Sequence, residues 1–173
     1  MDTTRSAKMA EEFLARRQPF KRKVQSYRRH YSTALETVFP QLCPTREADC
    51  LVGWVADLIY TDTGYAEPDG ILTTPDNNVL GPGLWIITRR EPNKLFEFVV
   101  IRGDGVVAHF TIELTDNGDG TCEGRWTLIF TAINDEGNVV IEAMPDRDPD
   151  FEFLVLNGLE HFLETGERME IPR

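Results

Sequence analysis

One group of side chains in this sequence has the composition of an acid–base centre. His109 and Glu113 lie on the same side of one predicted strand, and Arg125 lies in the next predicted strand, after a short turn. A histidine beside a carboxylate and an arginine can transfer a proton near neutral pH. The same residues, with Thr111 and Thr127, also fit the solvent face of two paired strands. We favour an exposed polar patch, because the positions between them are apolar.

Those apolar positions share the opposite face of the same two strands. Residues 106–114 alternate in polarity, and residues 121–132 do so again after the turn Asp116–Gly120. The apolar positions are Ala108, Phe110, Ile112 and Leu114 in the first strand, and Cys122, Gly124, Trp126, Leu128 and Phe130 in the second. A sheet with one apolar and one polar face needs a cover on one side only.

Two other sets of residues have the side chains of a metal site but not its spacing. Asp116–Gly120 is far shorter than an EF-hand calcium loop of about 12 residues, so it is predicted to be a hairpin turn. Cys43, Cys50 and Cys122 form no C-x-x-C pair, and the three histidines are scattered. We expect buried structural cysteines, no metal and no disulfide framework. The N-terminus shows no signal peptide, which favours a cytoplasmic location.

Length and charge narrow the class of protein. The chain has 173 residues, 41% of them hydrophobic, and no apolar run long enough for a membrane span, so one soluble globular domain is expected. The net charge is −11, although residues 1–30 hold nine basic and three acidic residues. An acidic body disfavours nucleic acid as a partner. We expect a basic N-terminal tail (1–23), a single domain (24–166) and a C-terminal tail (167–173).

The first third of the domain is predicted to mix a strand with short helices. A strand over 24–32 precedes a short helix over 34–42, which Thr33 or Ser32 caps. Glu36 lies three residues after Thr33, which fits a capping box. A second helical turn over 45–53 ends at Gly53. Further strands are predicted at 54–60, 70–74, 84–90, 95–102, 106–114 and 121–132. Short turns join these strands, which indicates an antiparallel meander. Asp57, Asp62 and Glu67 beside one of these turns fit either a gate at a cavity mouth or ordinary Asx turns.

The C-terminal segment is predicted to be the cover of the sheet. Asp148-Pro149-Asp150 has the composition of a helix start, and Gly166 that of a helix end. Apolar residues recur between them with helical spacing, at Phe151, Leu154, Val155, Gly158, Leu159 and Phe162. A long apolar helix beside a one-sided sheet must lie across the apolar face.

Several stretches of the chain resemble a known family. Residues 43–47, 53–67, 85–93, 111–121 and 130–138 look like the bacterial SRPBCC (START-related, polyketide-cyclase-like) proteins. The resemblance covers about residues 24–165 and implies an α+β helix-grip fold. That fold has a seven-stranded curved antiparallel sheet, two short helices and a long C-terminal helix over a cavity. Cys50 departs from the pattern, because a large aromatic residue is expected at this position. The loss of that aromatic residue would open or reshape one end of the cavity.

With this fold assumed, the aromatic residues become candidate lining of an apolar pocket. The predicted ligand-binding residues are Trp54, Trp85, Phe98, Phe110, Ile112, Trp126, Phe130, Leu154 and Phe162. Simple core packing explains the same residues, and both interpretations stay open. The function expected is non-catalytic binding of a small hydrophobic molecule, such as a lipid, a polyketide or an aromatic metabolite. No catalytic residue is expected, because the sequence shows no catalytic constellation. No cofactor is expected, because the G-x-S-x-G, Walker A and Rossmann glycine patterns are absent.

Two alternatives remain at this point. A cyclase or aromatase would use the same cavity, and it would need an ionisable residue such as His109, Glu97 or Glu113 pointing inward. A protein-interaction domain, like the relatives that regulate chaperone ATPases, would show an exposed apolar patch. A homodimer stays open as the oligomeric state.

Overall fold

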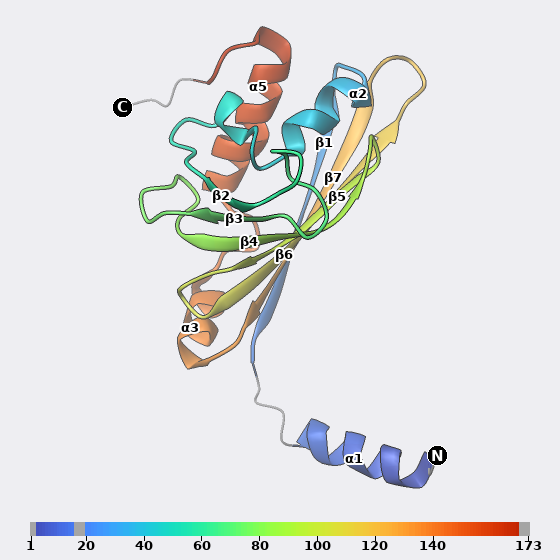
Figure 1. The fold of residues 1–173 in the computed structure, drawn as a ribbon, viewed down its shortest axis with the longest axis vertical. Helices are drawn as coiled ribbons and strands as arrows, with labels where there is room; N and C mark the ends of the chain where they lie inside the picture. The colour runs from blue at the N-terminus through green and yellow to red at the C-terminus, as the bar shows by residue number, and fades with distance from the viewer. Residues whose placement is uncertain (1–2, 16–19, 170–173) are drawn as a thin grey trace.

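The computed structural model describes residues 3–15 and 20–169 (Figure 1). Its centre is one seven-stranded antiparallel sheet in the order β1-β7-β6-β5-β4-β3-β2. The strands are β1 (Arg22–Tyr31), β2 (Asp57–Tyr60), β3 (Ile71–Thr74), β4 (Gly83–Glu91), β5 (Leu95–Ile101), β6 (Val106–Asp116) and β7 (Cys122–Ala132). Strands β2 to β7 follow chain order, and β1 forms the far edge beside β7. The predicted meander and the α+β sheet architecture are confirmed.

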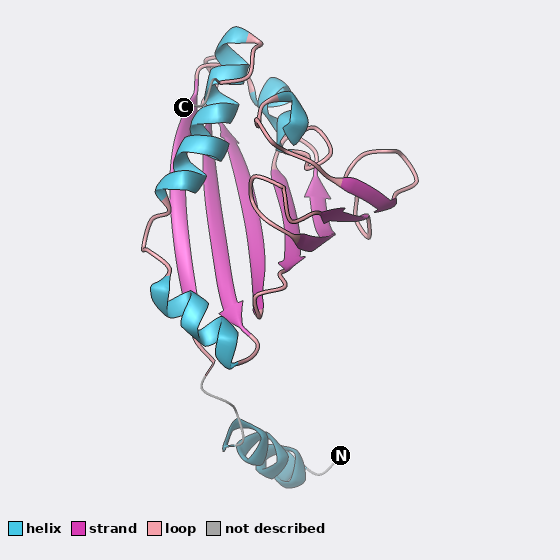
Figure 2. Cartoon of the chain, turned by 90° about the vertical axis from the view of Figure 1, so that its left-hand side faces the viewer, coloured by secondary structure: helices cyan, strands magenta, loops and turns pink. Residues whose placement is uncertain are grey.

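Every described helical element except α1 lies at an end or on one face of this sheet. The helical elements are α1 (Thr3–Ala15), α2 (Leu35–Val38), the 3₁₀ turns η1 (Phe39–Leu42) and η2 (Glu47–Asp49), α3 (Asp135–Ala143), α4 (Pro149–Phe151), η3 (Glu152–Asn157) and α5 (Gly158–Thr165). Elements α4, η3 and α5 follow one another without a break, and we call them the C-terminal helical segment. Figure 2 shows this segment lying over the long strands, while α1 stands apart from the sheet. None of the described helices is both long and apolar enough to cross a membrane.

The two faces of the β6–β7 hairpin are as the alternation predicts. All nine predicted apolar positions of β6 and β7 are buried, and the intervening residues are half-buried or exposed. Phe110 pairs with Leu128 across the hairpin, so both point to the same side. Gly124 makes room on this face for the ring of Tyr31 from β1, because an added Cβ would lie 2.7 Å from a ring carbon.

Both ends of the C-terminal helical segment are where the sequence predicts them. The Asp148 side chain accepts hydrogen bonds from the backbone N–H groups of Asp150 (3.0 Å) and Phe151 (3.2 Å). This is the N-cap arrangement expected for an aspartate before a proline. At the other end, Gly166 adopts a left-handed conformation (φ 76°) that suits glycine best. Its N–H donates to the carbonyl oxygen of Phe162 at 2.8 Å.

The first two helical turns differ from the prediction. Helix α2 begins at Leu35 after Ala34, which makes no side-chain cap, so the predicted cap by Ser32 or Thr33 is wrong. The helix covers only four residues and continues as the 3₁₀ turn η1, which contains Pro40. Proline lacks the N–H that a longer α-helix would need. The second helical turn, expected over 45–53, is the three-residue η2.

One predicted strand was too long, and one helix was not predicted. The strand expected at 54–60 is only Asp57–Tyr60. Trp54 instead turns its ring into the core, where its Nε1–H donates to the carbonyl oxygen of Pro44 at 2.9 Å. The prediction also missed helix α3. Asn134 caps that helix by accepting from the backbone N–H of Gly137 at 2.8 Å.

Candidate functional site

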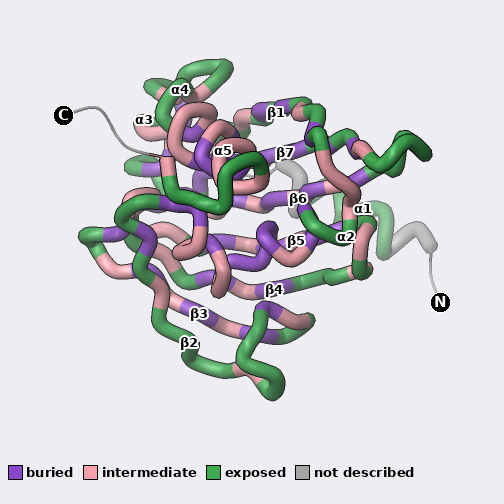
Figure 3. Tube along the Cα trace, turned by 90° about the horizontal axis from the view of Figure 1, so that it is seen from above, coloured by how far each residue is buried: buried purple, intermediate pink, exposed green. Residues whose placement is uncertain are grey.

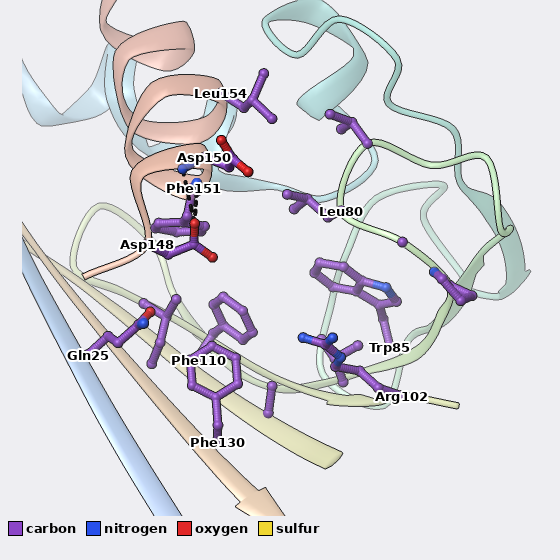
Figure 4. A pocket seen from close by; sticks show the side chains of 16 residues that line it. Gln25, Leu80, Trp85, Arg102, Phe110, Phe130, Asp148, Asp150, Phe151 and Leu154 are labelled. Atoms are coloured by element: carbon purple, nitrogen blue, oxygen red, sulfur yellow. Dashed lines mark hydrogen bonds between the residues drawn. The ribbon is translucent and has the colours of Figure 1, made fainter. Parts of the chain in front are cut away.

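A cavity of about 270 Å³ opens between the inner face of the sheet and the start of the C-terminal helical segment (Figure 4). Strands β4 to β7 form its floor with Trp85, Val100, Ala108, Phe110, Leu128 and Phe130. The loop 79–82 closes one side, and Phe151 and Leu154 of the helical segment close the other. The polar residues of the lining are Gln25, Arg102, Asp148 and Asp150.

Two aromatic rings of the floor, Trp85 and Phe110, stack on the buried ring of Phe98, which lies outside the lining. The ring centres of Trp85 and Phe98 are 5.0 Å apart, and those of Phe98 and Phe110 are 4.9 Å apart with an interplanar angle of 14°. Phe130 meets Phe110 edge-on at 6.2 Å. The Nε1–H of Trp85 donates to the hydroxyl oxygen of Thr74 at 3.1 Å, which holds the indole in place. The cavity therefore has an apolar wall with aromatic rings suited to stacking.

A chain of hydrogen bonds attaches the start of the helical segment to β1. The backbone N–H of Asp148 donates to the hydroxyl oxygen of Tyr27 at 2.9 Å. That hydroxyl donates in turn to Gln25 Oε1 at 3.0 Å, and Gln25 Nε2 donates to the carbonyl oxygen of Pro145 at 2.7 Å. Burial raises the pKa of Tyr27, so the phenol stays protonated and keeps its donor. These bonds position the helix start beside the cavity.

Charged groups occupy opposite walls of the cavity. Asp148 and Asp150 lie on the helix side, and Arg102 lies across from them near Trp85 (Figure 4). Arg102 also forms an ion pair of 2.5 Å with Asp104. The apolar floor therefore has a polar rim with a cation at one end and carboxylates at the other. Such a rim can orient a ligand whose body is apolar and whose ends are polar.

Four of the nine predicted ligand-binding residues line this cavity. They are Trp85, Phe110, Phe130 and Leu154. The other five lie outside the lining: Trp54, Phe98, Ile112 and Trp126 are buried in the core, and Phe162 is half-buried against it. Trp126 is separated from the cavity by Phe151, whose ring centre is 6.0 Å from that of Trp126.

The polar cluster around His109 lies on the outer face of the sheet. His109 Nε2 is 3.6 Å from Glu97 Oε1, and Glu97 also accepts from the Thr88 hydroxyl at 2.8 Å. Arg125 Nε donates to Glu113 Oε2 at 2.8 Å across the β6–β7 hairpin. None of these residues lines the cavity. The prediction of an exposed cross-strand polar patch is confirmed.

The sequence did not identify the polar rim. Asp148 was predicted as a helix cap, and nothing in the pattern showed that the cap would lie beside the cavity. Gln25 lies in a strand whose inner face carries polar residues, so the hydropathy of the sequence does not predict that Gln25 is buried. Arg102 directly follows the last residue of β5, and strand ends are the positions that a strand pattern places least well.

One buried carboxyl group lies outside the cavity lining. Glu47 of η2 is 7% exposed, and its Oε2 has no hydrogen-bond partner in the described structure. Burial raises the pKa of Glu47 to about 8, so the group is largely protonated at neutral pH. Cys50, one turn later, has its pKa raised to about 12, first by burial and then by the nearby carboxylates of Glu47 and Asp49. A thiol in this state is a poor nucleophile.

The carboxylates of the β6–β7 turn accept hydrogen bonds from backbone N–H groups of the same turn. Asp116 accepts from the backbone N–H of Gly118 at 2.8 Å, and Asp119 accepts from that of Thr121 at 3.0 Å. The prediction of a hairpin turn is confirmed. Across residues 3–15 and 20–169, no three His, Cys, Asp or Glu side chains are grouped so as to hold a metal ion. Cys43, Cys50 and Cys122 are all free and buried.

Solved structures share this arrangement. Norcoclaurine synthase from Thalictrum flavum, in complex with dopamine and hydroxybenzaldehyde, is 13% identical, with a TM-score of 0.61 over 84% of this chain and 88% of that one. Ara h 8.0201 is 10% identical, with a TM-score of 0.59 over 84% and 99%. CalU16 from Micromonospora echinospora is 14% identical, with a TM-score of 0.51 over 86% and 88%. No family model and no curated protein sequence matches the chain.

These structures have a curved antiparallel sheet, short helices and a long C-terminal helix in common with this chain. Identities of 10 to 14% support a likeness of fold and nothing finer. The predicted architecture is therefore confirmed, and we conclude that this chain has the helix-grip fold of the SRPBCC and Bet v1-type structures.

Proposed function

We propose that this protein binds a small apolar molecule in the cavity beneath the C-terminal helical segment, without catalysis. The observation that supports this most is the aromatic wall, in which Trp85 and Phe110 stack at an interplanar angle of 25° and line an open volume. A core that served only for packing would fill that volume, because protein interiors are close-packed.

The size of the cavity favours a compact ligand over a long chain. A dry cavity of about 150 Å³ accommodates benzene, and this one has about 270 Å³. One or two aromatic rings fit that space, whereas most of a long acyl chain would have to remain outside. The fold neighbour from Thalictrum flavum holds two single-ring aromatic molecules, which supports the same class of ligand. Of the three expected ligand types, the aromatic metabolite is therefore the one we propose.

A cavity-filling variant tests this function. Leu154→Trp places an indole at the cavity, and Leu163→Trp places one on the same helical segment outside it. Calorimetric titration with naphthalene and indole derivatives is expected to show binding to the natural protein and to Leu163→Trp. Binding to Leu154→Trp is expected to be at least tenfold weaker. Equal affinity in the two variants, or no binding of any aromatic probe to the natural protein, would contradict the proposal.

An enzyme that uses the same cavity is the second candidate. The ionisable side chains of the lining are Asp148, Asp150 and Arg102, and an acid–base mechanism would have to use them. Asp148→Asn keeps the helix cap, because asparagine caps as well as aspartate, but it removes the carboxylate. Turnover of a bound aromatic substrate that Asp148→Asn abolishes, while binding persists, would favour this candidate.

A further inference from the structure

The strand β2 forms one open edge of the sheet. It pairs with β3 on one side, and no further strand lies beyond it in the described sheet. All four of its residues, Asp57–Tyr60, are exposed, as Figure 3 shows at the edge farthest from β1. The pairing register shifts between Leu58 and Tyr60, so Ile59 is an extra residue that bulges from the strand.

Large apolar side chains gather at this edge. Leu58 is 45% exposed, Ile59 62% and Tyr60 56%, and Tyr65 in the following loop is 57% exposed. Exposed apolar groups that are contiguous, rather than scattered, mark interaction sites. An open strand edge also offers unpaired backbone groups to an extended peptide.

The loop beside the edge is held in one shape by Glu67. The Glu67 carboxylate accepts hydrogen bonds from the hydroxyl groups of Thr61 (2.9 Å) and Thr63 (2.8 Å) and from the backbone N–H groups of Asp62 (2.5 Å) and Thr63 (3.2 Å). These bonds lower the pKa of Glu67, with the Thr63 hydroxyl as the largest cause. Tyr65 is therefore presented from an ordered turn next to the strand.

The charge of this region is one-sided. Residues 48–88 contain six acidic residues and no Lys, Arg or His. Strand β1, at the other edge, has four Lys or Arg residues and no acidic one. Natural proteins commonly protect a sheet edge with charged side chains, especially lysine. Strand β1 carries this kind of protection, whereas β2 contains no lysine or arginine.

We infer that the β2 edge binds an extended, basic segment of another protein, which adds a strand beside Asp57–Tyr60. Its Lys or Arg side chains would meet the acidic surroundings, and apolar residues between them would cover Leu58 and Ile59. A second copy pairing through its own β2 edge would bring two acidic regions together. Helix α1 has two basic and two acidic residues, so it lacks the complementary charge.

Selection from a random octapeptide display library on the immobilised full chain tests this inference. Enriched peptides are expected to alternate Lys or Arg with Val, Ile, Leu or aromatic residues. A synthetic peptide of that kind is expected to lose at least tenfold in affinity when Ile59→Lys introduces a like charge. Its affinity is also expected to fall as sodium chloride is raised from about 0.05 to 0.5 M.

Val24→Lys is the matched control, because Val24 is 57% exposed on the opposite edge strand. Both variants are expected to keep the melting temperature of the natural chain, since both sites are exposed. The inference is overturned if no peptide is enriched, if enriched peptides are acidic or unbiased in charge, or if both variants weaken binding equally. It is also overturned if sedimentation shows a dimer of the full chain that Ile59→Lys dissociates, because the occupant would then be a second copy.

Discussion

Glu47 is the residue at which burial and charge conflict most directly. Its carboxyl group is buried with one oxygen unpartnered, and its pKa in the folded protein is about 8. The unfolded chain restores an ordinary carboxyl pKa near 4.3. Between these values the unfolded state binds fewer protons at this site than the folded state does. Glu47 therefore makes stability fall as pH rises from about 4.5 to about 8, and it has no further effect above that range.

Glu47→Gln is expected to remove this pH dependence. Glutamine has nearly the same shape and cannot ionise, so the variant should gain stability over the natural protein as pH increases through the window. One linked proton contributes a slope of about 1.4 kcal/mol per pH unit. Urea unfolding at pH 5, 6, 7 and 8 measures the difference. A constant difference across these pH values would show that Glu47 is ionised in the folded state.

Trp85 and Trp126 form a matched pair for locating the ligand. Each indole is buried and donates to a hydroxyl oxygen, Trp85 to Thr74 and Trp126 to Tyr31. Only Trp85 lines the cavity. Trp85→Phe is expected to weaken the binding of an aromatic probe severalfold, whereas Trp126→Phe should leave the affinity unchanged. Calorimetry on both variants checks this, and the opposite result would move the binding site toward β1.

The C-terminal helical segment is the element that holds the cavity closed. Its buried residues include Leu156, which is fully inaccessible, and Leu159 at 2% exposure, while Phe162 is only half-buried. Leu156→Ala is expected to cost about 2–5 kcal/mol of unfolding free energy. Phe162→Ala should cost less than Leu156→Ala, because part of its ring already contacts water. Chemical denaturation measures both, with Val139→Ala as the control at an exposed helical site.

How far the elements were predictable depends on whether one face of each was buried. The β6–β7 hairpin and the stripe from Phe151 to Leu159 repeat with the period of their structure, so pattern alone located them. The sequence pattern did not reveal helix α3, because its apolar residues are adjacent at 139–141 and only Ile141 of these is buried, which leaves little periodicity in nine residues. The predicted cap by Ser32 or Thr33 is wrong because it rested on a local motif alone, whereas this helix also has to bury Val38 and Phe39 in the core.

The middle of the helical segment has a feature that no pattern indicated. Residues Glu152–Asn157 form a π-helix, which widens one turn above the sheet. Arg29 of β1 reaches this turn and donates to Asn157 Oδ1 at 3.2 Å, with Glu152 3.5 Å away. The contact joins a strand and a helix that are more than 120 residues apart in sequence. Such long-range contacts are outside what hydropathy periodicity can predict.

At the scale of the whole molecule, we expect the N-terminal helix to be separable from the domain. Helix α1 stands apart from the sheet, whereas Phe20 packs against the core and Lys21 donates from its backbone N–H to Asn138 Oδ1 at 2.7 Å. Removal of residues 1–15 is therefore expected to leave the melting temperature within about 2 °C and the affinity for aromatic probes unchanged. Thermal scanning and calorimetry of the shortened chain check this. A larger fall would mean that α1 docks on the domain.

The alkylation rates of the three buried thiols can report local opening of the structure. Cys43 and Cys50 flank η2, and Cys122 lies in β7 between two other strands. An alkylating reagent reaches a buried thiol only during the moments when its surroundings open, so each labelling rate measures the free energy of one opening event. The rate at Cys122 follows unfolding of the sheet. The rates at Cys43 and Cys50 follow release of the η1–η2 connection, without any engineered probe.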